Sequence, residues 1–313
     1  MKKILVCGAT GFIGKNVTLE LAKNKNYEVH AVRFKRPAYS TPKNVIWHKA
    51  DLRNASSVNN LTKNTDIVIQ LAATTSGSKD IVSMPYVHVT DNAVMNSYIL
   101  RSCFDNEVKH FLFTSCTVMY PSSKKSTKES DFTGEIIEKY KGVGETKVYI
   151  EKIAKFFSTL GKTKHTIIRH SNIYGPHDKY DLNKSHVFGA TITKVMTAND
   201  TLDIWGDGSE IRDFLHVEDL ISFIKLAIQK QKTPYEIYNC GSGIPTSIKK
   251  ICGLIVKGSK KQLKLNFDKN KPTISFDLHL NCKKAEKELN WKPKISIENG
   301  IKKTIIWWKK NIT

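Results

Sequence analysis

Short apolar runs alternate along the chain with longer stretches in which apolar positions recur at helical spacing. Six runs rich in Val, Ile and Phe predict strands, and they read KILVCG, YEVHAVRF, NVIWHKAD, TDIVIQLAA, HFLFTSC and TIIRHSNIYG. Because these runs are almost uniformly apolar, we expect strands that are buried on both faces of a parallel sheet. The segments between them, such as KNVTLELAKNKN and residues 90–107, have the length and pattern of helices. The strand–helix order therefore predicts an α/β fold with a doubly wound parallel sheet.

The second half of the chain has a looser pattern. After about Asn172, Gly and Pro interrupt it in YGPHD, WGDGSEIRDF and NCGSGIP. We expect a larger domain at residues 1–172 and a smaller lobe at residues 173–313. Segment 214–241 carries a helix pattern followed by the apolar run EIYNCG, and we expect it to return to the larger domain.

Gly8, Gly11 and Gly14 in CGATGFIG follow the first predicted strand and open the first predicted helix. Glycines at these places let the backbone turn tightly and approach a pyrophosphate, whose charge the amides at a helix N-terminus stabilise. A plain tight turn is the alternative, but the position inside a strand–helix–strand unit favours a dinucleotide site. The further candidate cofactor contacts in this part of the chain are Thr10, Phe12, Ile13, Asp51, Leu52, Leu71, Ala72 and Ala73.

The end of the second predicted strand bears on the choice of cofactor. An acidic residue ~20 residues after the glycine motif would bind the adenosine ribose, but Arg33 stands there, followed by Lys35 and Arg36. A guanidinium pairs with a 2′-phosphate, which a carboxylate would repel. The sequence thus favours NADP(H) over NAD(H). The alternative is that these cations only solvate the surface of a lysine-rich chain.

Together these segments resemble the extended short-chain dehydrogenase/reductase family of NAD(P)-dependent nucleotide-sugar epimerases, dehydratases and reductases. The resemblance extends in order over nearly the whole chain, through FTSCTVMYP, SNIYGP, WGDGSEIRDFLHVEDL, YNCGSG and KELNWKPKISIENGIKKTIIWW. Within the family, HDKYDLNKSHVFGATI and FDKNKPTISFD are most similar to GDP-fucose synthase, the GDP-4-keto-6-deoxymannose epimerase/reductase. The resemblance implies that residues 1–172 bind the dinucleotide and that residues 173–313 bind the nucleotide sugar.

The resemblance also implies a reaction centre of a Tyr, a Lys four residues later, and a Ser or Thr on a nearby strand end. The Tyr moves a proton to or from the sugar oxygen, and the Lys binds the nicotinamide ribose and lowers the Tyr pKa. Lys147 matches, but Val143 stands at the Tyr position. Cys116, followed by Thr117, stands at the Ser/Thr position. Further cofactor contacts implied by the resemblance are Thr114, Lys147 and His170.

Three functions remain open for this altered centre. Tyr140, three residues before Val143, could replace the missing phenol in an NADP-dependent reductase. Alternatively, Cys116 and His186 could form an acid/base pair for epimerisation of a 4-keto sugar, because both groups exchange protons at accessible pH. The third possible function is that of a protein that binds a dinucleotide and a nucleotide sugar without catalysing a reaction. His186 is chosen because the family uses the His of an S-H-V segment as an acid.

The substrate contacts that we expect lie mostly in the second half of the chain: Thr75, Cys116, Asn172, His186, Val187, Trp205, Arg212 and Lys271. Arg212 would bind the diphosphate, or it would pair with Asp213 or Glu218 to order the lobe. Trp205 would lie near the base, or it would belong to the core.

Composition and net charge limit the classes of binding partner and the cellular location that we expect. The net charge of +21 would suit nucleic acid, but the lysines are spread along the whole chain and we expect no nucleic-acid partner. No apolar run approaches ~20 residues, so we expect no membrane span, and the N-terminus reads as a strand rather than a signal peptide. Six scattered cysteines without a C-x-x-C pair argue against a metal site or disulfides and suit the cytoplasm. The family resemblance implies a homodimer formed through the helices near residues 90–107 and 140–160.

Overall fold

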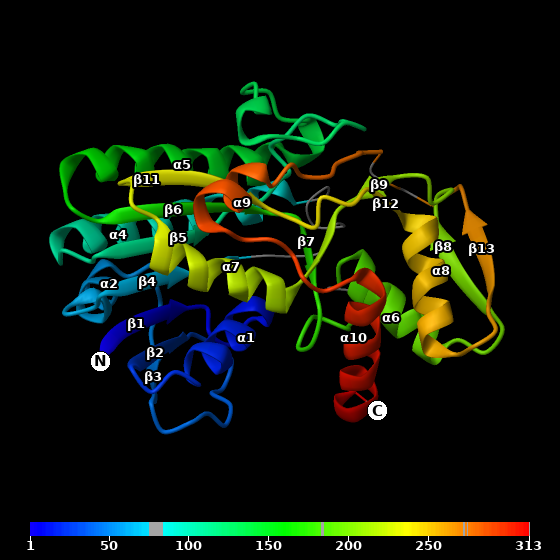
Figure 1. Cartoon of the computed structure of the whole chain (residues 1–313), viewed down its shortest axis with the longest axis horizontal. Helices are drawn as coiled ribbons and strands as arrows, with labels where there is room; N and C mark the ends of the chain where they lie inside the picture. The colour runs from blue at the N-terminus through cyan, green and yellow to red at the C-terminus, as the bar shows by residue number, and fades with distance from the viewer. Residues whose placement is uncertain (75–83, 183–184, 272, 274, 313) are drawn as a thin grey trace.

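A computed structural model describes residues 1–74, 84–182, 185–271, 273 and 275–312. Its largest element is a seven-stranded sheet in the order β11-β6-β5-β4-β1-β2-β3, in which every neighbouring pair is parallel (Figure 1). The strands are β1 (Lys2–Cys7), β2 (Tyr27–Arg33), β3 (Val45–Lys49), β4 (Ile67–Gln70), β5 (His110–Thr114), β6 (Lys164–His170) and β11 (Tyr235–Cys240). The predicted doubly wound α/β fold is confirmed.

Helices cover both faces of this sheet, each over its own hydrophobic core (Figure 1). One face carries α1 (Phe12–Leu21), α7 (Val217–Lys230) and α9 (Lys283–Leu289). The other face carries α2 (Ala55–Thr62), α4 (Thr90–Asp105) and α5 (Lys141–Leu160). Because the strand order reverses direction at β1 and β4, the carboxyl ends of these two strands flank the point at which such sheets bind ligands.

A third core lies beside the sheet, at the right of Figure 1. It is formed by α6 (Val187–Thr197), α8 (Ile248–Ser259), α10 (Ile297–Asn311) and the parallel pair β8 (Thr201–Trp205) and β13 (Lys264–Asp268). Two small pairs join this part to the sheet: β7 (Asn172–Tyr174) with β10 (Phe214–His216), and β9 (Ile211–Arg212) with β12 (Thr246–Ser247). The short helices are η1 (Pro85–His88), η2 (Glu129–Asp131) and η3 (Glu138–Tyr140).

The structure corrects two expectations about strands. The run TIIRHSNIYG is not one strand, because β6 ends at His170 and β7 leaves the sheet to pair with β10. The run NVIWHKAD is not buried on both faces, since β3 lies at the edge of the sheet and Ile46 is 41% exposed. Both differences follow from the strand order, which apolar content alone does not reveal.

Three further observations concern cysteines, metals and membranes. All six cysteine thiols are free, four of them buried. Within the described ranges, no group of three or more His, Cys, Asp or Glu side chains is placed to hold a metal ion. No helix in the described part of the chain is long and apolar enough to cross a membrane.

Candidate functional site

The glycine motif forms a close turn between β1 and α1. Gly8 has φ +76°, and a Cβ atom built there would lie 2.7 Å from the Cα of Ala72, which follows β4. A Cβ at Gly14 would lie 2.1 Å from the carbonyl oxygen of Gly8. Gly11 is the N-cap of α1 and offers no side-chain cap, so the first amides of the helix are left for an anion. The geometry fits the pyrophosphate of a dinucleotide.

Cationic side chains lie around the end of β2 and the glycine turn. Arg33 is the last residue of β2, and the Nη1 atom of Arg36 lies 3.4 Å from the carbonyl oxygen of Thr10 in the glycine motif. The Nζ atom of Lys15, in the first turns of α1, lies 4.6 Å from the centre of the Tyr39 ring. Arg33, Arg36 and Lys15 therefore bring positive charge to the end of β2 and the glycine turn, the side on which we expect the adenosine of a dinucleotide.

Asp51, the expected adenine contact, is already held by an arginine that the sequence analysis did not select. Arg53 donates to both carboxylate oxygens of Asp51, with Nη2 at 2.7 Å from Oδ2, and these bonds hold the Asp51 pKa below its ordinary value. Arg53 also donates to Asp91 on α4 and stacks over Phe34. Arg53 lies only two residues after Asp51, but residue spacing gave no sign that it pairs with Asp51 and Asp91.

The turn after β4 is fixed from α4. Leu71 and Ala72 are next to the glycine turn, and the amide of Asn92 receives the backbone N–H of Thr74 and donates to its carbonyl. Asn92 lies inside α4 and is not a helix cap. Leu52 is buried, and Ala73 is exposed. Thr75, an expected sugar contact, lies outside the described residues.

Lys147 is fixed at the end of β5. Helix α5 places it one turn after Val143, on the same face. Its Nζ atom donates to the carbonyl oxygen of Thr114 at 2.8 Å and lies 4.4 Å from the centre of the Phe113 ring. Burial lowers the pKa of Lys147, opposed by nearby Cys116 and Glu151. The lysine position is therefore kept, while Val143 brings no proton carrier to it.

Cys116 lies two residues beyond β5 and remains partly accessible, as does its neighbour Thr117. Burial raises the thiol pKa above 9.0, and the Lys147 ammonium opposes this. The thiol is thus protonated at neutral pH and is a donor. The raised pKa follows from the packing around the Cys116 side chain, which disfavours the charged thiolate.

Tyr140 is the N-cap of α5 and is also only partly buried. Its ring packs edge-on against Phe276 at 5.9 Å between ring centres. Burial raises the pKa of its hydroxyl, the guanidinium of Arg212 opposes this, and Cys116 adds to it. The hydroxyl is therefore near the thiol, but its environment disfavours the phenolate that a proton shuttle needs.

Two histidines continue this cluster towards α6. His170 ends β6, its Nδ1 atom lies 2.8 Å from the Ser171 carbonyl, and burial lowers its pKa to about 4, aided by Lys147 and His186. His186 is the N-cap of α6 and is exposed, yet desolvation by the surrounding chain lowers its pKa below 6.5. Both rings are neutral at pH 7. Cys116, Lys147, His170 and His186 thus form one chain of electrostatic neighbours.

The expected substrate contacts in the smaller region divide into two groups. Arg212 is next to Tyr140, and its Nη1 atom donates to the carbonyl oxygens of Ile211 and Phe276. The Asn172 amide donates to the Asp213 carbonyl at 3.1 Å, and Val187 follows His186 at the start of α6. The second group consists of Trp205 and Lys271.

Trp205 and Lys271 lie at the ends of β8 and β13, farther along the chain. Trp205 is 50% exposed, so the alternative that it belongs to the core is wrong. It ends β8 on the outward side of the alternating strand, beneath the ammonium of Lys194. Lys271 is exposed and its backbone N–H donates to the Asp268 carbonyl.

Asp277 and Glu218 have partners of their own. The carboxylate of Asp277 accepts a hydrogen bond from the Ile211 backbone N–H at 2.7 Å. Glu218 pairs with Lys303 at 2.6 Å. Burial lowers the pKa of the Arg212 guanidinium, and nearby Tyr140, Glu210 and Asp277 oppose this.

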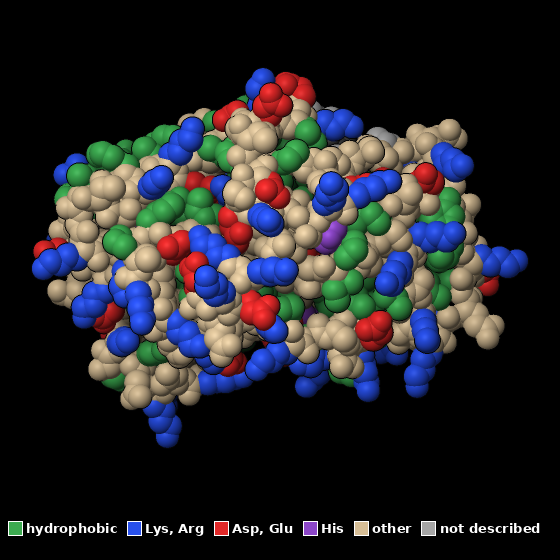
Figure 2. Space-filling view, turned by 45° about the horizontal axis from the view of Figure 1, so that its top comes forward, with side chains coloured by type: hydrophobic (Ala, Val, Ile, Leu, Met, Phe, Trp, Pro, Cys, Tyr) green, Lys and Arg blue, Asp and Glu red, His purple; other side chains and the backbone are tan. Residues whose placement is uncertain are grey.

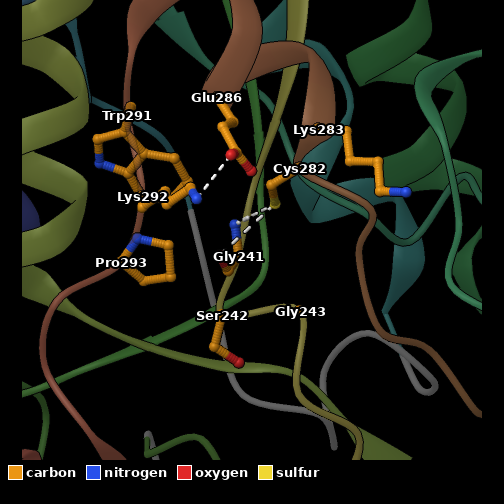
Figure 3. Close-up of a pocket in the computed structure, with 9 residues that line it drawn as sticks. All are labelled: Gly241, Ser242, Gly243, Cys282, Lys283, Glu286, Trp291, Lys292 and Pro293. Atoms are coloured by element: carbon orange, nitrogen blue, oxygen red, sulfur yellow. Dashed lines mark hydrogen bonds and ion pairs between the residues drawn. The ribbon is translucent and has the colours of Figure 1, made fainter.

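Two cavities lie away from this cluster. One of about 360 Å³ is lined by the Gly241–Gly243 turn, Cys282 and Trp291, and Figure 3 shows the Lys292–Glu286 ion pair beside it. The other, of about 610 Å³, lies between α1 and α7. Neither contains any residue predicted to be catalytic. On the face displayed in Figure 2, Lys and Arg side chains are spread among acidic and apolar ones rather than gathered in one patch.

Comparison with known proteins agrees with this arrangement. The sequence profile of the "NAD dependent epimerase/dehydratase family" matches residues 4–241. The chain is 29% identical to GDP-L-colitose synthase of Yersinia pseudotuberculosis over 96% of both chains. It is 26% identical to GDP-L-fucose synthase of Azorhizobium caulinodans, over 97% of this chain and 95% of that one. Among solved structures, UDP-glucose 4-epimerase of Thermotoga maritima with UDP-glucose matches 99% of this chain and 100% of its own, with a TM-score of 0.87 and 24% identity.

Proposed function

Because the chain belongs to the NAD-dependent epimerase/dehydratase family, we propose that it is an enzyme that epimerises a 4-keto nucleotide sugar. The observation that carries this proposal is the replacement at the reaction centre. Val143 stands one turn before Lys147, while the Cys116 thiol and the His170 imidazole are neighbours of that lysine, and His186 is in turn a neighbour of His170. The similarity to GDP-colitose and GDP-fucose synthases supports a GDP-sugar as the substrate.

In the proposed reaction His186 and Cys116 move protons. Neutral His186 takes the proton from the carbon next to the keto group, and an enolate forms. The Cys116 thiol gives a proton to the opposite face of that carbon, which inverts it, and Lys147 stabilises the negative oxygen. Bound nicotinamide dinucleotide would supply hydride for any reduction of the 4-keto group. Arg212 and Asn172 would hold the diphosphate and the sugar.

The proposal is tested by incubating the protein with a GDP-4-keto-6-deoxy sugar in deuterated water without added cofactor. We expect deuterium at C3 or C5 of the sugar, measured by NMR or mass spectrometry. If no label enters, and parallel incubations with NADPH and several such sugars consume no NADPH, the chain is a silent binding protein. NADPH consumption without label would instead favour the reductase in which Tyr140 acts.

We expect a broad pH profile for this exchange. His186 must be neutral to accept a proton, so the rate rises as pH passes its pKa, which lies below 6.5. Cys116 must be protonated to donate, so the rate falls only above its pKa, which lies above 9.0. The initial rate of deuterium uptake should therefore be flat across neutrality. A narrow maximum between these two limits would contradict the assignment.

We also propose NADP(H) as the preferred cofactor, and the proposal is supported by Arg33 at the end of β2 and by the approach of Arg36 to the glycine turn. The parent protein should bind NADPH more tightly than NADH, by about tenfold for each charge-assisted pair. Replacing Arg33→Asp should level or reverse this preference in calorimetric titrations. Arg101→Asp, on the outer side of α4, is the control and should leave it unchanged. Equal affinities in the parent would refute the preference.

We propose that two copies of the chain pair through α4 and α5. These neighbouring helices expose large apolar side chains, and the Tyr149 hydroxyl on α5 lies 2.9 Å from the Ser97 hydroxyl on α4. The exposed apolar side chains are Tyr98, Tyr149, Phe156 and Leu160. On α5 they recur at seven and four residues and therefore share one face. Such a face is typical of a surface that a partner covers.

Phe156→Lys should weaken this dimer at least tenfold, because it places a charge in an apolar interface. Sedimentation velocity over a range of concentrations would measure the change. Ile306→Lys, at a 59% exposed position on α10, is the matched control and should leave the association unchanged. A parent chain that is monomeric at high concentration would contradict the proposal.

A further inference from the structure

A buried ion pair lies directly behind the reaction centre. Glu151 on α5 and Arg169 on β6 meet with Oε2 and Nη2 at 2.6 Å, and each side chain is only 4% exposed. The other oxygen of the carboxylate, Oε1, accepts a hydrogen bond from the Ser115 hydroxyl at 2.6 Å. One carboxylate thus ties together α5, β6 and the segment that follows β5.

Glu151 lies near both Lys147 and Cys116, the proposed acid. Val143, Lys147 and Glu151 follow one another at intervals of four residues and lie along one face of α5. Ser115, which donates to Glu151, immediately precedes Cys116. Glu151 is therefore one helical turn from the lysine, and its hydrogen-bond partner Ser115 is the residue next to the thiol.

The far side of the ion pair is anchored, so Glu151 has little freedom to move. The Nη1 atom of Arg169 donates to the Tyr120 hydroxyl at 3.0 Å and to the Glu129 carbonyl at 3.1 Å. The Tyr120 hydroxyl in turn donates to Asn239 on β11 at 2.7 Å. This network extends the fixed geometry across the carboxyl-terminal edge of the sheet.

We propose that Glu151 is a positioning residue, which acts through Ser115 to hold the Cys116 thiol beside Lys147. This proposal rests on the proposed function, because holding the thiol in place serves catalysis only if Cys116 donates a proton. Packing alone does not require the pair, because apolar side chains of the same shape fill such a place about as well. An ion pair with a directed hydrogen bond does define an orientation, and proton transfer depends on orientation.

Four charged or titratable groups face Cys116 from the elements around it. They are Lys147 and Glu151 on α5, Arg169 on β6 and Tyr140 at the end of η3. The Cys116 pKa is raised first by burial; Lys147 and Arg169 lower it, and Glu151 raises it. Removing the charge of Glu151 should therefore lower the thiol pKa.

The first test needs no substrate, so its failure can be told apart from failure of the proposed function. Cys116 is alkylated with iodoacetamide over a range of pH, and the modified peptide is quantified by mass spectrometry. In Glu151→Gln the midpoint of the profile should move down by roughly one pH unit. Glu145→Gln, an exposed carboxylate on the same helix, is the control and should keep the parental midpoint. A folded Glu151→Gln protein with the parental midpoint would overturn the proposal.

The second test removes only the link and keeps the ion pair, so it also serves if Glu151→Gln does not fold. Ser115→Ala should lower kcat for deuterium exchange about tenfold while KM stays the same, because the substrate site is untouched. Ser158→Ala, whose hydroxyl donates to the Lys155 carbonyl farther along α5, is the matched control and should behave like the parent. An unchanged kcat in Ser115→Ala would show that the ion pair is only structural.

Discussion

Replacing Cys116→Ala should lower the rate of deuterium exchange into a GDP-4-keto sugar by about 100- to 10,000-fold, the usual contribution of a general acid. The reason is that the Cys116 thiol is a donor in the electrostatic neighbourhood of Lys147, and burial raises its pKa, which keeps the proton on sulfur at neutral pH. Alanine removes the proton while leaving the glycine turn and the Lys147 contact with Thr114 unaltered. Initial rates of label uptake, measured with the substrate at saturation, would give the loss directly.

Two variants control this experiment. Cys282→Ala removes another partly buried thiol, which lies beside the Gly241 backbone in the smaller cavity, and it should retain the parental rate. Tyr140→Phe should also retain the rate, because the Tyr140 hydroxyl has a raised pKa and its ring packs on Phe276. If Tyr140→Phe loses activity and Cys116→Ala keeps it, the phenol is the proton carrier and our assignment is wrong.

Replacing Gly14→Ala should cost the chain its dinucleotide affinity and about 1–3 kcal/mol of unfolding free energy, the usual cost of overpacking. The added Cβ would lie 2.1 Å from the Gly8 carbonyl oxygen and 2.8 Å from its carbon, both of them backbone atoms that no rotamer change can move. The β1–α1 turn would have to open, and the amides that face a pyrophosphate would be displaced. Thermal unfolding and calorimetric titration with NADPH measure the two effects.

A second glycine in a helix provides the matched control. Gly253 lies within α8, and a Cβ built there meets nothing within 4 Å. Gly253→Ala should stabilise the protein by roughly 0.5–1 kcal/mol, because alanine loses less conformational freedom in a helix. Its NADPH affinity should equal that of the parent. Parental binding by Gly14→Ala would mean that the glycine turn does not hold the cofactor.

Much of the fold was predictable because apolar content and spacing mark buried strands. The six runs and the helices at residues 90–107 and 140–160 all correspond to observed elements. What the pattern could not give was the neighbour of each strand. The break at Ser171, where β7 pairs with β10 instead of continuing β6, depends on a residue more than 40 positions away.

The candidate site was predictable in its positions more than in its chemistry. Motif order located Gly8, Lys147 and Cys116, but the raised pKa of the thiol comes from the packing around it. Arg53 and Glu151 were missed for the same reason. Their partners are Asp91 on α4 and Arg169 on β6, and such pairs leave no periodic signal in the sequence.

The sequence by itself determined the doubly wound sheet, the glycine turn and the absence of a tyrosine at Val143, because each of these depends on residue type at a short, fixed spacing. Only the tertiary structure decided which side chains surround Lys147 and which protons they hold at neutral pH. The physical reason is that pKa values and buried ion pairs arise from desolvation and from charges that different elements bring together, such as Lys147 on α5 with Cys116 after β5, and Glu151 on α5 with Arg169 on β6.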